Sequence, residues 1–119
     1  MFSQKAVDRI LIIEKKIKFI QAIVQEKGSI RTALEDEQNT RASILMHLTS
    51  IAEQFDKLLH NGELEILAFF EKEDIKGSYD LRTFIAHDYE GVDLYIVEDV
   101  IEKRLPIILE SINKIKKLK

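Results

Sequence analysis

The sequence predicts an all-α protein, folded as an up-and-down bundle of four to six helices. Apolar residues recur at spacings of three and four along several stretches, which is the periodicity of helices with one buried face. No stretch alternates apolar and polar residues in the manner of a β-strand. The 119 residues are enough to bury one core, so we expect a single domain over residues 1–119.

The composition excludes several classes of function. With 45% hydrophobic and 33% charged residues, and no apolar run near the ~18 residues of a spanning helix, we expect a soluble protein that does not enter a membrane. The first five residues lack an apolar signal region, which favours the cytoplasm. There is no cysteine, and His47, His60 and His87 form no close pair, so we expect no metal and no cofactor. The net charge of −3 is mildly adverse to nucleic-acid binding but permits a locally basic cleft.

The first half of the chain predicts two long helices. One runs over roughly 3–27 and stops at Gly28, because glycine readily takes the left-handed conformation that closes helices. Its apolar face is wide enough to suggest a second partner surface, another subunit being one possibility. Thr32 to Glu35 has the form of a capping box, so a second helix of about 28 residues is expected to start there. It ends near His60, which we interpret as a cap, whereas His47 is interpreted as a packing or surface residue.

The third quarter of the chain predicts two shorter helices. Residues 63–72 hold enough apolar side chains for a short helix. Residues 73–78 are polar and contain a glycine, so they are predicted to form a loop. Ser78 is a natural N-cap for the helix that follows, and that helix carries Arg82.

The last part of the chain predicts a sharp break and one further helix. Residues 90–93 end the preceding helix, and Asp93 caps the next one. Val92 and Val97 flank that cap at the spacing of a hydrophobic staple, which fixes the angle at which the chain enters the helix. Pro106 lies within the apolar stripe that continues beyond, so we expect a kink or a restart of the helix there.

One stretch, residues 82–89, gathers a cation, an imidazole, a carboxylate and a phenol. Arginine is a permanent fork of donors suited to phosphate, and histidine exchanges protons near neutral pH, so Arg82 and His87 form a minimal set for cleaving a phosphodiester. The alternative is that His87 caps a helix and Arg82 pairs with a surface acid. Five residues of a helix turn about 140°, so the two side chains do not share a face. We expect the helix to end near His87 and a second copy to supply the facing half of a cleft.

This stretch resembles the signature of the HepT-like toxins of the HEPN superfamily, Arg-x4-His-x-Tyr, here Arg82, His87 and Tyr89. The resemblance covers most of the chain. Its further points are Gly91-Val92-Asp93 after the motif, the later Leu105-Pro106, and Ile51-Ala52-Glu53 on the long helix. The chain departs from the family pattern at Thr83, where relatives usually carry asparagine.

The resemblance implies a small helical homodimer that acts as a metal-independent endoribonuclease toxin on RNA. The arginine and histidine of both subunits would meet at the dimer interface, with His87 as general acid or base and Arg82 on the scissile phosphate. Tyr89 would be the residue that a cognate nucleotidyltransferase antitoxin of the MNT type modifies with AMP, as in a type VII toxin-antitoxin pair.

Three further residues are weaker candidates, and two other functions stay open. Asp88 is a candidate to orient His87, and Thr83 and Glu53 are candidates for contact with the substrate. The acidic charge and Thr83 also fit a non-catalytic helical subunit that binds nucleotides or partners a separate nucleotidyltransferase. The third possibility is an interaction module without chemistry.

Overall fold

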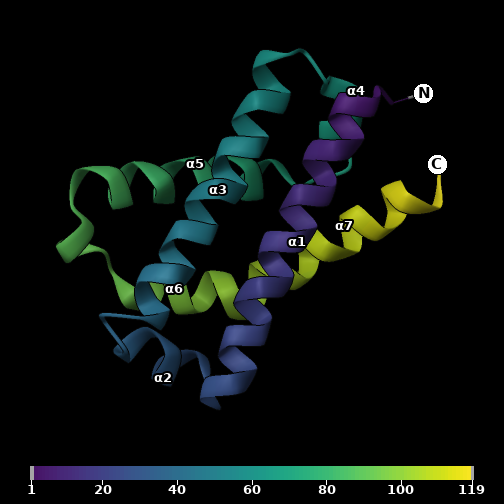
Figure 1. Ribbon diagram of the computed structural model, residues 1–119. Helices are drawn as coiled ribbons and strands as arrows, with labels where there is room; N and C mark the ends of the chain where they lie inside the picture. The colour runs from purple at the N-terminus through teal and green to yellow at the C-terminus, as the bar shows by residue number, and fades with distance from the viewer. Residues whose placement is uncertain (1, 119) are drawn as a thin grey trace.

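The computed structural model describes residues 2–118 and shows the all-α bundle that the sequence predicts (Figure 1). Its elements are α1 (Gln4–Lys27), α2 (Ile30–Glu35), α3 (Thr40–His60), α4 (Leu64–Leu67), α5 (Lys72–His87), the 3-10 turn η1 (Tyr89–Gly91), α6 (Leu94–Asp99), the π-helical segment η2 (Val100–Arg104) and α7 (Leu105–Lys117). Over this described range there is no strand, and no helix is long and apolar enough to cross a membrane.

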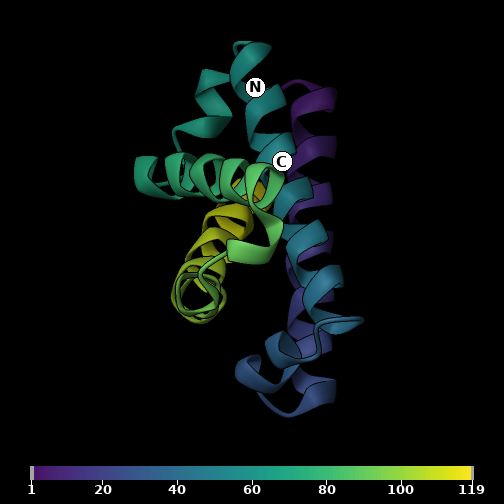
Figure 2. The same ribbon diagram turned by 90° about the vertical axis from the view of Figure 1, so that its left-hand side faces the viewer.

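The helices form two layers. α1 and α3 lie side by side and antiparallel, while α5 and the run from α6 to α7 cross one face of that pair (Figures 1 and 2). α2 lies at one end of the first layer and α4 lies near the other end. α3 makes its most extensive contacts with α1 and with α5, so the position of α5 is set mainly by α3.

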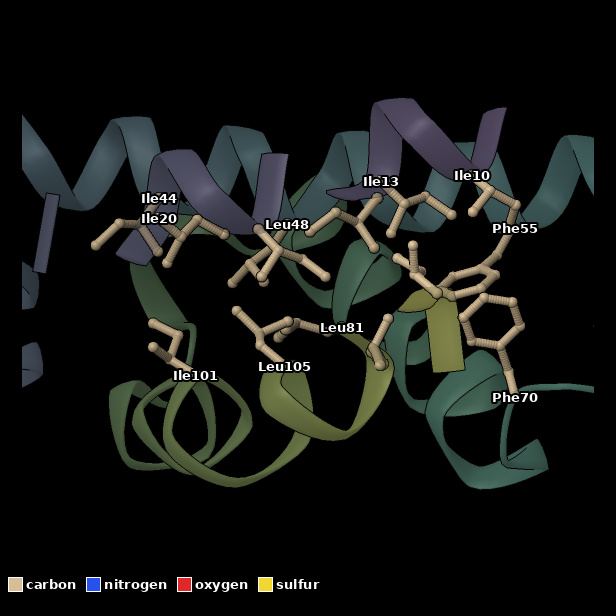
Figure 3. Close-up of a cluster of buried hydrophobic side chains, with 14 of the residues drawn as sticks. Ile10, Ile13, Ile20, Ile44, Leu48, Phe55, Phe70, Leu81, Ile101 and Leu105 are labelled. Carbon is tan, nitrogen blue, oxygen red and sulfur yellow. The ribbon is translucent and has the colours of Figure 1, made fainter. Parts of the chain in front are cut away.

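The core fills the space between the two layers. Ile13 and Leu48 from the first layer approach Leu81 and Leu105 from the second, as Figure 3 shows. α5 buries only one apolar side chain, that of Leu81, among those described. Because a buried leucine contributes roughly 2 kcal/mol, α5 needs further contacts to hold its position.

A partly buried ion pair supplies one such contact between α5 and η2. Arg104 donates from Nε to Oδ1 of Asp74 at 2.6 Å, and its Nη2 also contacts Glu71 and Glu73 at the start of α5. The side chain of Asp74 is only 2% exposed. The hydrogen bond to Asp74 is the main reason why the pKa of Arg104 is raised. Because the Oδ2 atom of Asp74 is buried without a hydrogen-bond partner among the described residues, Arg104 provides most of its charge compensation.

The first predicted helix is confirmed, but the second begins later than predicted. α1 ends at Gly28, where φ is 95°, whereas α2 is a separate short helix that ends at Glu35. The capping box at Thr32 is wrong because Ser29 is the N-cap: its Oγ accepts the N–H of Thr32 at 3.0 Å. Two side chains in the first turn of α3 stabilise the break by donating to α2 carbonyls, Thr40 to Ala33 and Arg41 to Leu34.

The predicted loop at residues 73–78 is also wrong, because these residues form the first half of α5. Ser78 is not an N-cap: it lies inside the helix, and its hydroxyl donates to the carbonyl of Ile75 at 2.8 Å. Gly77 costs a helix about 1 kcal/mol relative to alanine. Acidic residues in the first turn of α5 interact favourably with the helix dipole, and Arg104 of η2 pairs with Asp74 there. These interactions offset the cost of Gly77.

Most of the remaining predictions for the second half are confirmed. α4 lies within the short helix expected at residues 63–72. Asp93 caps α6, since its Oδ1 accepts the N–H of Tyr95 at 2.9 Å, while Val97 is fully buried and Val92 packs against the core; the contact expected between these two valines stays a prediction. The expected restart occurs at α7, directly after the π-helical segment. Pro106 explains it, because proline has no N–H to continue the ladder.

The two structural histidines are placed as the sequence predicts. Nδ1 of His60 lies 2.9 Å from the carbonyl of Asp56 in the last turn of α3, as expected for a cap. His47 packs its ring against Phe19 of α1, with 5.3 Å between the ring centroids. Burial, together with the charge of Lys16, lowers the pKa of His47.

Replacing Arg104 by methionine is expected to lower the free energy of unfolding by about 3 kcal/mol, because it leaves the Asp74 carboxylate buried and unpaired. Urea denaturation followed by circular dichroism measures this change. Lys103→Met is the matched control, because Lys103 is the neighbour of Arg104 in the chain and, within the described range, pairs only with the exposed Asp99. This change is expected to alter stability little. Equal midpoints for the two variants would contradict the role given to the buried pair.

Candidate functional site

The stretch at residues 82–89 spans the last turns of α5 and the turn η1. His87 is the last residue of the helix, and the N–H of Asp88 closes it by donating to the carbonyl of Phe84 at 2.8 Å. The helix therefore ends at His87, as one of the two expected geometries requires. The imidazole of His87 is exposed at this end.

A tight turn follows the helix and carries Tyr89. Oδ1 of Asp88 accepts the N–H of Gly91 at 3.1 Å, so this carboxylate caps the turn. A Cβ atom at position 91 would lie 2.2 Å from Oδ2 of Asp88 and 2.7 Å from its Cγ. A larger residue at position 91 would therefore displace the Asp88 carboxylate from its cap. The predicted role of Asp88 in orienting His87 stays a prediction.

Arg82 lies on the side of α5 that faces α3. The Cζ atom of its guanidinium is 5.7 Å from the ring centroid of Tyr79, and its Nη1 is 3.9 Å from Oδ2 of Asp56 on α3. At that separation Asp56 attracts the guanidinium without forming a short hydrogen bond. Arg82 is thus held in place between two helices while keeping donors available for an anion.

The structure does not bring Arg82 and His87 together within one chain. No hydrogen bond or ion pair connects these two side chains anywhere in the part of the chain that the structure describes. Arg82 faces α3, and His87 follows it by five residues, or about 140° around the helix. A reaction that uses both groups needs either motion of the helix end or a second chain.

The two other candidate residues occupy different surroundings. The hydroxyl of Thr83 donates to the carbonyl of Tyr79 at 3.1 Å, so this hydroxyl is hydrogen-bonded within α5 itself. Glu53 is exposed on α3, one turn before Asp56. Their roles stay predictions. Asp56 is a surface acid of the kind that the alternative interpretation gave to Arg82, but its identity was not predicted, because no local pattern links residues on two different helices.

A comparison of the sequence with models of known protein families identifies the family of this chain. The family model described as "Ribonuclease HepT-like" matches residues 13–115, which extend from α1 into α7 and include the whole of residues 82–89. The chain belongs to the HepT-like ribonuclease family. This membership confirms the resemblance to the HEPN superfamily and indicates a ribonuclease. Searches of curated proteins and of solved structures find no match.

In this HepT-like chain, Gly91→Ala is expected to destabilise the fold by about 1 kcal/mol, because the added Cβ displaces the Asp88 carboxylate from its cap. In an Asp88→Ala background, the same change should cost much less, because the atoms that it would meet are gone. Thermal unfolding of the two single variants and the double variant measures this coupling. Simple additivity would show that the turn does not depend on the Asp88 cap.

Proposed function

We propose that the protein is a metal-independent endoribonuclease toxin of a type VII toxin-antitoxin pair, active as a homodimer, with Arg82 and His87 as its catalytic residues. The family match carries the proposal, since it is a ribonuclease family and its matched range includes both residues. The geometry adds support, because Arg82 keeps donors free at the α3–α5 junction and His87 is exposed at the end of α5.

The proposed reaction uses the nucleophile that RNA itself carries. His87 acts as general base or acid: one imidazole removes the proton of the ribose 2′-hydroxyl, whose oxygen attacks the adjacent phosphorus. The bond to the 5′-oxygen breaks, and that oxygen takes a proton, which leaves a 2′,3′-cyclic phosphate and a 5′-hydroxyl. Arg82 binds the non-bridging oxygens and stabilises the charge that develops on them. A metal ion is not required to generate the nucleophile.

A second copy of the chain supplies the facing half of this site. Arg82 and His87 lie on different sides of α5, so the two groups from one chain do not converge. Large apolar side chains next to them are exposed, with Phe84 at 64% and Ile96 on α6 at 54%. Exposed aromatic and aliphatic side chains of this size are typical of interfaces between subunits.

Tyr89 is the proposed site of neutralisation. Its phenol oxygen attacks the α-phosphate of ATP in the antitoxin, an MNT-type nucleotidyltransferase, and pyrophosphate leaves. The product carries AMP on η1, two residues from His87, where its phosphate competes with RNA for Arg82. Support comes from the exposure of Tyr89 on a short turn at the end of α5.

One observation favours a second candidate, a non-catalytic nucleotide-binding or partner subunit of the nucleotidyltransferase. Thr83 replaces the usual asparagine, and its hydroxyl is bonded to its own helix, so it offers the substrate less than an amide would. Under this alternative the chain binds nucleotides or the transferase and cuts no RNA.

His87→Ala is expected to reduce RNA cleavage by the purified protein in EDTA about 100-fold or more, because it removes the general base or acid. Arg82→Ala should cause a similar loss. The readout is the rate at which a fluorescent single-stranded RNA is cut. His47→Gln is the matched control, since His47 packs against α1 and should be dispensable for cleavage. Undiminished cleavage by His87→Ala would rule out the proposed catalytic residue.

Co-expression with a cognate MNT-type nucleotidyltransferase is expected to raise the intact mass of the protein by one or more AMP units. The increase should vanish in Tyr89→Phe, because the phenol oxygen is the nucleophile. Tyr95→Phe is the control, because Tyr95 is the more exposed tyrosine and should leave the modification unchanged. The same increase in Tyr89→Phe would place the modification elsewhere.

A further inference from the structure

We propose that a cavity between α3 and α5 is a subsite for one nucleotide of single-stranded RNA beside the scissile phosphate. The inference rests on the proposed function, and it assigns a binding place to a part of the substrate that lies outside the proposed catalytic residues. The cavity has a volume of about 480 Å³ and opens on the surface of α5 that also carries Arg82. Cavities of this size accommodate small organic ligands.

The floor and walls of this nucleotide subsite are apolar. Its floor includes the buried ring of Phe55 and the small side chain of Ala52, both from α3. Leu59 and Tyr79 stand at its sides, and about half of each side chain is exposed. A nucleobase presents two flat apolar faces, which stack on aromatic and aliphatic surfaces of this kind without regard to sequence.

Cations follow one edge of the nucleotide subsite. Lys72 and Lys76 line it from successive turns of α5, and Arg82 follows further along the same helix, where it contacts the lining residues Tyr79 and Asp56. At 1.5 Å per residue, these three cations extend over about 15 Å. Lys76 also pairs with Asp80 at 2.8 Å, but an exposed pair of this type is weak and a phosphate replaces it readily.

The subsite is directly connected to the proposed catalytic arginine. Two of its lining residues, Tyr79 and Asp56, are the ones that contact the guanidinium of Arg82. Asp56 is the single acid among the eight lining residues, and its two oxygens face Arg82 and His60. An apolar cavity edged by cations and adjoining Arg82 fits a ligand that combines an aromatic base with a phosphate backbone.

The test uses a fluorescent ten-nucleotide single-stranded RNA in which every 2′-hydroxyl is methylated, so that it cannot be cut by the proposed reaction. The double variant Lys72→Glu/Lys76→Glu is expected to bind it about tenfold more weakly, with a slope of log Kd against log salt reduced by about 1.4 for two lost phosphate contacts. Lys103→Glu is the matched control, because it reverses one lysine of a similar exposed pair outside the cavity.

A second pair of variants tests the base contact. Leu59→Ala is expected to weaken binding of the same RNA about fivefold, whereas Leu118→Ala, which is equally exposed at 52% but lies on the last turn of the chain, should not change it. A sugar-phosphate chain of the same length without bases should bind more weakly to the wild-type protein, and Leu59→Ala should have no effect on its binding.

The outcomes separate this inference from the proposed function. If the wild-type protein cuts RNA but the lysine and Leu59 variants bind the methylated RNA as the controls do, the subsite is wrong and the ribonuclease stands. If binding depends on the lysines but not on Leu59 or on the bases, the nucleotide subsite is also wrong. The lysines would then bind any polyanion, such as an acidic partner. Binding that depends on all of them, without cleavage by the wild-type protein, supports the subsite and contradicts the catalytic role. If the wild-type protein neither binds the methylated RNA nor cuts RNA, both the subsite and the proposed function are wrong.

Discussion

The attachment of α5 to the rest of the bundle is the constraint on which the candidate site depends. One buried leucine, Leu81, and one partly buried ion pair, Asp74 with Arg104, hold this helix against α3 and η2. Near its end, the partly buried Ile85 packs against the core, and the cap that Asp88 forms with Gly91 closes the helix. A helix fixed at its start and at its end, with little of its surface buried, leaves most of its side chains free for other molecules.

The two open sides of α5 differ in character, and the two proposed catalytic residues, Arg82 and His87, lie on different sides. Arg82 and Tyr79 face α3 and the cavity edged by lysines. On the other side Phe84 lines a second groove, of about 450 Å³, shared with α6, and His87 follows it by one helical turn. One side suits a charged substrate with aromatic bases, and the other suits an apolar partner surface. The proposed composite site, built from two copies of the chain, would use both sides at once.

Local signals in the sequence predicted those parts of the fold that local contacts determine. Gly28, the Asp93 cap and the restart near Pro106 belong to this group, because each effect acts within one helical turn. The start of α3 and the first half of α5 were wrong because side chains distant in the sequence decide them. Arg104 stabilises α5 through Asp74, thirty residues earlier in the chain, and no pattern within residues 73–78 contains that information. The identity of Asp56 as the acid near Arg82 escaped prediction for the same reason.

The net charge of −3 is a sum over the whole chain, and such a sum is a poor predictor of whether one part of the surface binds an anionic ligand. Charges on a protein surface act over roughly 8 Å at physiological ionic strength, so a phosphate senses only its neighbours. Near the start of α5, three acids surround Arg104, and Asp56 lies between Arg82 and His60. These carboxylates are engaged with cations of the protein itself. Lys72 and Lys76 line the cavity, and of the residues that the structure describes only the exposed Asp80 pairs with Lys76, so this edge is more basic than the composition indicates.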